Sequence, residues 1–175
     1  MKKILVLGLA LALSFSAFSQ FQFKGVGAGL SLGSQAGYSS NGSSSMGLGI
    51  NINGLAQVTD KIDAEASFSY FFPSEYNDPF FGFNYKMNIM TLSANGRYNF
   101  YQESGITAYG LAGLNLSIFS FDIAGATSSA SELGLNIGVG GAYEITTDID
   151  ATAQIGYTIG DADQLFINLG VLYKF

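Results

Sequence analysis

Apolar residues alternate with small or polar residues along most of this chain, and this period of two constrains the fold more than any other feature of the sequence. Successive residues of a β-strand point to opposite faces, so the alternation predicts strands whose two faces meet different environments. Eight such segments can be read: residues 25–33, 46–53, 62–70, 92–99, 108–118, 133–144, 149–159 and 165–175. Before residue 91 the phase of the fourth segment is ambiguous, which predicts a β-bulge there.

The connections between these segments alternate in length. Short connections cover residues 59–61, 101–105 and 146–148, long ones cover residues 35–45, 71–85 and 119–132, and the last, residues 160–164, is short. Tight turns on one side and longer loops on the other are typical of outer-membrane barrels, in which the tight turns are periplasmic. We therefore expect both termini and the three tight turns at the periplasmic end.

The polar face of the eight segments indicates which side meets lipid. It consists mainly of glycine, serine and asparagine, and eight strands of such residues would not form a dry core, although the chain is 48% apolar and 14% aromatic. Turning the apolar face to lipid and the polar face to the lumen accounts for both facts. The sequence therefore predicts an all-β fold, an eight-stranded antiparallel up-and-down transmembrane β-barrel.

Aromatic residues gather near the predicted strand ends, where lipid headgroups favour them. Those at the outer ends are Tyr70, Phe71, Phe119, Phe121 and Tyr157, and those at the periplasmic ends are Tyr98, Phe100, Tyr101, Tyr143, Tyr173 and Phe175. We therefore expect two girdles of lipid-facing rings.

The first residues differ from the rest of the chain. Lys2 and Lys3 precede an apolar run over residues 4–13 and small residues up to Gln20. This order predicts a signal peptide over residues 1–19, cleaved before Gln20, and a barrel domain over residues 20–175; the alternative is a buried N-terminal helix. Cleavage leaves five basic residues against thirteen acids, a balance that excludes a nucleic-acid surface.

The strand-like ending, residues 165–175, and the glycine-rich opening, residues 25–30, resemble those of the small outer-membrane β-barrels of Gram-negative bacteria, the OmpA/OmpX type and related outer membrane protein beta-barrel domain proteins. The resemblance implies that alternate residues of the ending form the signal read by the barrel-assembly machinery: Ile167, Leu169, Val171, Tyr173 and Phe175. It also implies export to the bacterial outer membrane, contact with periplasmic chaperones during biogenesis, and then with outer-membrane lipid and lipopolysaccharide. No peptidoglycan-binding domain follows the barrel, so wall anchoring is not expected.

Six charged residues share the lumen face near the periplasmic end: Asp63, Glu65, Arg97, Glu144, Asp150 and Lys174. An eight-stranded barrel leaves an interior that side chains just fill, and confined charges are tolerated when they are paired and hydrogen-bonded. We predict that the six interlock in one layer as a polar plug; the alternative is a cation-selective constriction. Above them the small lumen residues predict a water-filled cup open to the outside, unless Phe166 fills part of it.

The connection over residues 71–85 is rich in aromatic rings, among them Phe72, Tyr76, Phe80, Phe81 and Phe83. They are candidates for binding an apolar ligand, a glycan or a protein. The simpler interpretation, which we favour, is an aromatic belt on strands that are longer than the alternation indicates.

Histidine and cysteine are both absent from the sequence. A serine triad, a thiol nucleophile and a zinc site are therefore excluded, and only carboxylate chemistry is left as an enzymatic alternative. We expect a monomer without enzymatic activity, cofactor or metal. Its predicted role is structural or surface-interacting, with the lumen plugged at the periplasmic end; the alternative is a narrow porin-like channel for small or apolar solutes.

Overall fold

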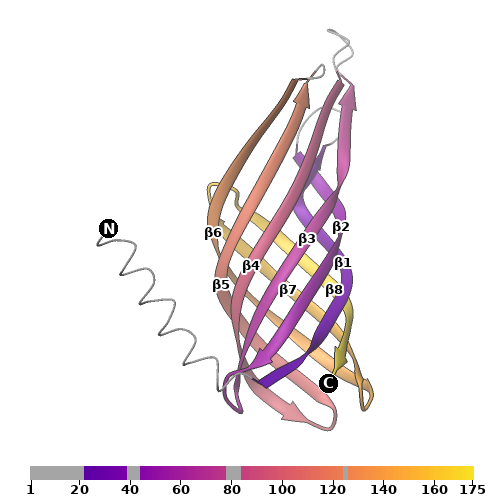
Figure 1. The fold of residues 1–175 in the computed structure, drawn as a ribbon, viewed down its shortest axis with the longest axis vertical. Helices are drawn as coiled ribbons and strands as arrows, with labels where there is room; N and C mark the ends of the chain where they lie inside the picture. The colour runs from indigo at the N-terminus through magenta and orange to yellow at the C-terminus, as the bar shows by residue number, and fades with distance from the viewer. Residues whose placement is uncertain (1–21, 39–43, 78–83, 124–125) are drawn as a thin grey trace, which may run out of the picture.

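The computed structural model describes residues 22–38, 44–77, 84–123 and 126–175, and these form a closed barrel of eight antiparallel strands (Figure 1). The strands are β1 (Gln22–Tyr38), β2 (Ser44–Gln57), β3 (Ile62–Asn77), β4 (Asn84–Glu103), β5 (Ile106–Ile123), β6 (Ala126–Thr146), β7 (Ile149–Gly160) and β8 (Gln164–Lys174). Each strand pairs with its neighbours in sequence, and β1 pairs with β8 to close the barrel. The predicted fold is confirmed. None of the described residues belongs to a helix long and apolar enough to cross a membrane.

Several strands are longer than the alternation indicated. β4 has 20 residues and β6 has 21, whereas β7 has 12 and β8 has 11. A strand needs about 9–11 residues to cross the hydrocarbon layer, so the long strands extend beyond it. They project past the turn between β7 and β8 at the end of the barrel opposite the C-terminus (Figure 1). Much of the predicted long connections, residues 71–85 and 119–132, is therefore strand. For residues 71–85 this agrees with the favoured interpretation that the strands are longer than the alternation indicates, whereas the long connection over residues 119–132 was predicted wrongly.

The predicted bulge also lies elsewhere. β4 pairs with β5 without a register shift from Tyr85 to Asn99, and the irregularity lies in β3, between Phe71 and Ser74. The phase of β4 was ambiguous for another reason. The side chains of Met87 and Ile89 are apolar, yet both are buried, which shows that they face the lumen.

The two faces of the barrel have the predicted character over most of its length. Leu30, Ile50 and Ile155 are exposed on the outer surface, whereas Asn51, Asn95 and other polar residues are buried in the lumen. A Cβ atom added to Gly29 would lie 2.2 Å from the carbonyl oxygen of Leu169 on the neighbouring strand β8. Close approach of neighbouring strands therefore explains why the lumen face of β1 is rich in glycine.

The outer end of the lumen departs from this pattern. Ala36, Phe71, Met87 and Ile89 are buried together there, with Phe119 and Phe121 packed against them. We call these six residues the apolar cluster. Phe71, Phe119 and Phe121 were predicted to belong to a lipid-facing girdle. That prediction was wrong, because they continue the lumen face of β3 and β5 beyond Ser69 and Ser117. The other predicted girdle lies at the end of the barrel that holds the C-terminus, which we call the periplasmic end after the prediction. Its rings are exposed on the outer surface, as expected: Tyr98, Phe100, Tyr101, Tyr143, Tyr173 and Phe175.

Candidate functional site in the barrel lumen

A buried ion pair lies in the periplasmic half of the lumen. Arg97 on β4 pairs with Glu65 on β3, and each residue is only 4% exposed. Two amides also donate hydrogen bonds to the carboxylate of Glu65, Asn95 over 2.9 Å and Asn53 over 3.2 Å. Each oxygen of Glu65 therefore accepts at least one hydrogen bond, which is the condition under which a buried charge is tolerated.

A second ion pair lies nearer the periplasmic mouth. Nζ of Lys24 is 3.1 Å from Asp63, which also accepts a hydrogen bond of 2.8 Å from Asn99. Lys24 was not among the predicted lumen charges, because strict alternation gives it the lipid-facing phase of Val26. The pairing of β1 with β2 shifts register between Phe23 and Gly25, and this irregularity lets Lys24 reach the lumen.

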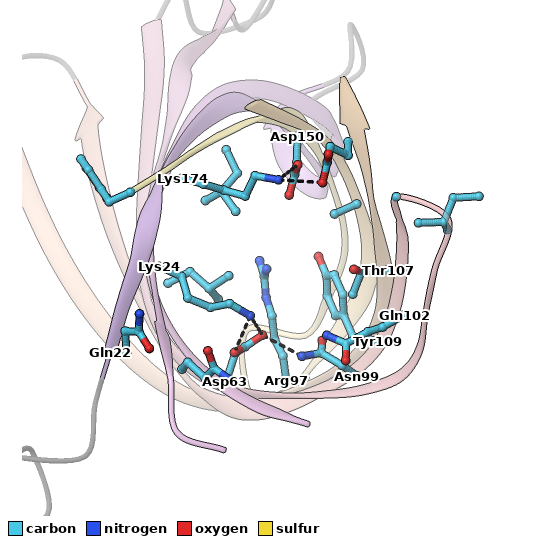
Figure 2. A pocket seen from close by; sticks show the side chains of 18 of the residues that line it. Gln22, Lys24, Asp63, Arg97, Asn99, Gln102, Thr107, Tyr109, Asp150 and Lys174 are labelled. Carbon is cyan, nitrogen blue, oxygen red and sulfur yellow. Dashed lines mark hydrogen bonds and ion pairs between the residues drawn. The ribbon is translucent and has the colours of Figure 1, made fainter. Parts of the chain in front are cut away.

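The remaining charges form a separate group on β6, β7 and β8. Nζ of Lys174 lies 3.1 Å from Glu144 and 2.7 Å from Asp150. Figure 2 shows Lys174 and Asp150 across an open cavity from Arg97, Asp63 and Lys24. All six predicted residues are thus at the same end of the lumen, but the prediction that they interlock in one layer was wrong.

The cavity between the two groups has a volume of about 450 Å³ and opens at the periplasmic end. We call it the vestibule. Tyr109 on β5 lies at its inner end, 1% exposed, with its ring centroid 4.4 Å from Cζ of Arg97. Among the described residues, neither Nε of Arg97 nor the Tyr109 hydroxyl has a hydrogen-bond partner. The alternation had already placed Tyr109 on the polar face of β5, but gave it no role.

Amide and hydroxyl side chains fill the middle of the lumen. Asn136 donates to Asn95 over 3.1 Å and accepts from Thr158 over 2.8 Å, and Asn115 donates to Ser93 over 2.9 Å. The two cavities found there have volumes of about 20 and 10 Å³. A water molecule needs about 10–15 Å³ on this measure, so each holds one or two waters at most.

The predicted water-filled cup is therefore wrong for the described residues, since the amides fill the middle of the lumen and the apolar cluster lies beyond them. The sequence does place small residues on the lumen face. Longer amide side chains on other strands occupy the space that these small residues leave. Phe166 does line the cavity of 20 Å³.

The predicted aromatic surface at the outer end is only partly described. Phe72 is 46% exposed on the outer face and lies edge-on to Tyr70, and Tyr76 lies within β3. Phe80, Phe81 and Phe83 fall outside the described residues.

The ending of the chain forms the last strand and lies beside β1. Leu169, Val171, Tyr173 and Phe175 are exposed on the outer face, and Ile167 shares their phase on β8. The Phe175 ring stacks on Phe23 with the centroids 5.5 Å apart. The alternate residues of the predicted assembly signal therefore lie on one side of the strand that closes the barrel.

A family model described as outer membrane protein beta-barrel domain matches residues 5–175. Three similar solved structures are also barrels of this kind. Ail of Yersinia pestis, in complex with the heparin analogue sucrose octasulfate, has a TM-score of 0.63 and 16% identity over 87% of this chain and 98% of that chain. Neisserial surface protein A has a TM-score of 0.61 and 20% identity over 89% and 97%. OprG of Pseudomonas aeruginosa has a TM-score of 0.61 and 14% identity over 87% and 95%. At these identities the likeness shows the fold alone. A comparison with curated proteins finds no match.

Proposed function

Since the chain belongs to the outer membrane protein beta-barrel domain family, we propose that it serves in the bacterial outer membrane as a closed barrel with a structural or surface-interaction role. Two successive layers of the lumen support a closed barrel. The first comprises the Arg97–Glu65 pair and the amides around Asn95 and Asn136, and the second is the apolar cluster.

The observation that carries the proposal is the small free volume in the middle of the lumen. The two cavities found there, of about 20 and 10 Å³, have room for one or two waters each and not for a continuous file of water. An ion crossing this region would exchange its hydration for contacts with a few amides, and it would then meet the apolar cluster. Hydrophobic constrictions without water oppose conduction.

A surface-interaction role is supported by the strands that extend beyond the membrane-crossing length. The outer part of the barrel carries the acids Glu75, Asp122 and Glu132, while Lys86 is paired with Glu75 over 3.3 Å. Ail was solved with a sulfated polyanion. The excess of acidic residues on the outer part of this barrel would repel such a partner. We therefore propose a neutral or basic partner, since like charges on two surfaces oppose association.

Potassium efflux from proteoliposomes tests the closed barrel. The variants are Arg97→Ala with Glu65→Ala, which opens the polar layer, and Phe71→Ala with Ile89→Ala, which opens the apolar one. We expect the unmodified barrel to retain potassium as protein-free vesicles do, and the variant with all four changes to leak. Phe72→Ala, a change on the outer face, is the matched control and stays tight. Rapid efflux through the unmodified barrel would contradict the proposal.

One observation favours a narrow channel for small or apolar solutes instead. The vestibule carries solvent-accessible space from the periplasmic mouth as far as Arg97 and Tyr109. A channel would require the amide layer and the apolar cluster to move aside together. Efflux that needs no change in either layer would favour this alternative.

A further inference from the structure

The outer part of β6 has a neighbouring strand on one side only. Residues 126–133 pair with β5, but the pairing of β6 with β7 begins only at Gly134. Leu133, just past this point, is 74% exposed, whereas Leu135, which has Ile159 of β7 beside it, is 57% exposed. Among the described residues, no strand therefore pairs with the N–H and C=O groups that residues 126–133 direct away from β5. We call this stretch the β6 edge.

The β6 edge lies beyond the part of the barrel that crosses the membrane. β7 has 12 residues, about the length that crosses the hydrocarbon layer, and it pairs with β6 from Gly134 toward the periplasmic end. Figure 1 shows β6 continuing past the turn between β7 and β8, at the end opposite the C-terminus. An uncovered strand edge in water is a template for pairing with another extended chain.

The corresponding edge of β3 is protected against such pairing. Residues 72–77 pair with β4, but the pairing of β3 with β2 stops at Phe71. Pro73 has no N–H to offer there, and the register with β4 shifts between Phe71 and Ser74. Both features oppose the addition of a strand. The β6 edge has neither, since residues 126–133 contain no proline and no lysine and keep a continuous register with β5.

The lumen side of the β6 edge favours apolar side chains on an added strand. Ala130 and Ser128 are small and share the face of their partners on β5. Those partners are Phe119 and Phe121, whose rings are only partly buried. Neighbouring strands are about 4.8 Å apart, so an apolar side chain on the added strand can approach these rings across the small residues. Glu132 has the same face and is the one charged residue of the stretch, which favours a basic residue opposite it.

A second copy of the barrel is a poor match for the β6 edge. Two barrels in one membrane have β6 running in the same direction, so their β6 edges would pair in parallel, which is slightly less stable per residue. The β3 edge of a second copy would run antiparallel to β6, but it carries Pro73. An extended segment of another protein has neither restriction, because it can take the antiparallel direction.

From this arrangement we infer that the β6 edge binds an extended segment of an external protein, which adds to β6 as a further strand. The segment has apolar residues at alternate positions, directed to the lumen side, and a basic residue opposite Glu132. This inference rests on the proposed surface-interaction role and names its site and its kind of partner.

A synthetic peptide with blocked ends, Thr-Lys-Thr-Val-Thr-Val-Thr, is the probe. Its binding to the barrel in lipid nanodiscs is measured by the fluorescence anisotropy of a dye-labelled form. Two derivatives carry N-methyl groups, one on the threonines and the other on the lysine and the valines. Alternate residues of a strand direct their N–H groups to the same edge. We therefore expect one derivative to bind at least about tenfold more weakly than the probe and the other to bind like it, because only one loses its hydrogen bonds to β6.

Amide hydrogen exchange locates the bound probe on the barrel. In the barrel alone, alternate amides over residues 127–133 should exchange rapidly, while those between them are protected by β5. The probe should slow the rapidly exchanging amides. Protection of these amides that rises with barrel concentration, without probe, would indicate a second copy at the edge and would overturn the inference. Equal binding of the two N-methylated derivatives would also overturn it.

Ala130→Lys and its matched control Ser120→Lys test the edge in the protein. Ala130→Lys places an inward-pointing charge on the β6 edge and should weaken binding at least about tenfold. Ser120→Lys adds the same charge on the outer face of β5, an interior strand, and should leave binding unchanged. A heat-modifiable gel band confirms that both variants are folded, and equal binding to both would contradict the assignment. Failure of the probe to bind would reject the β6 edge but not the closed barrel, which potassium efflux tests separately.

Discussion

Replacing Glu65 with glutamine tests the energetics of the buried ion pair. The change keeps the size of the side chain and an oxygen that can accept from Asn95, but it removes the charge opposite Arg97. Arg97 then lies 4% exposed without its carboxylate partner. Removing one member of a buried pair lowers stability by about 3–5 kcal/mol, and we expect a loss of this size.

The control is Glu144→Gln, which changes the same functional group at the edge of the lumen. The Glu144 side chain is 47% exposed, and Lys174 keeps Asp150 as its partner. Water screens this ion pair, so the expected loss is below about 1 kcal/mol. The double variant Arg97→Met with Glu65→Gln leaves no unpaired charge at this position. Its loss of stability should be smaller, by about 1–3 kcal/mol, than the sum of the losses caused by Arg97→Met alone and Glu65→Gln alone.

Equilibrium unfolding in urea, with the barrel in lipid vesicles, measures these free energies. The sequence has no tryptophan and ten tyrosines, so tyrosine fluorescence and the heat-modifiable gel band report the folded fraction. Equal losses for Glu65→Gln and Glu144→Gln would refute this account of the ion pair, as would strict additivity in the double variant.

Two further predictions concern packing and assembly. Gly113→Ala places a Cβ 2.2 Å from the carbonyl oxygen of Ala94, whereas Gly110→Ala finds no atom within 4 Å, so only the former should lose the heat-modifiable band. Phe175→Ala should slow insertion in cells but leave refolding from urea nearly unchanged if the terminal ring is a signal for assembly. Phe100→Ala, another exposed ring at the same end, is its control, and equal effects of the two changes in cells would contradict the assignment.

The barrel could be predicted from the sequence because lipid and lumen impose opposite polarities on alternate residues. That contrast disappears where a strand leaves the membrane or where the lumen itself is apolar. Met87 and Ile89 show the second case, since their side chains are apolar although they face inward. The strand ends and the apolar cluster could therefore not be predicted from the alternation alone.

The candidate site was predicted in part for a similar reason. Alternation identified the lumen face of Glu65, Arg97 and Lys174, but it does not tell which of eight strands bring their charges together. Lys24 was missed because a register shift in β1 changes its phase. The contact of Arg97 with the Tyr109 ring joins two strands, and no local pattern in the sequence contains it.

Single-channel recording in planar bilayers tests the closed barrel most directly. With the barrel inserted and its folding verified on a gel, we expect a baseline without steady openings, because the two cavities found in the middle of the lumen have volumes of only about 20 and 10 Å³. Steady openings of uniform size in the unmodified barrel, which vanish when Arg97 or Glu144 is changed, would contradict the account and would indicate a narrow channel instead.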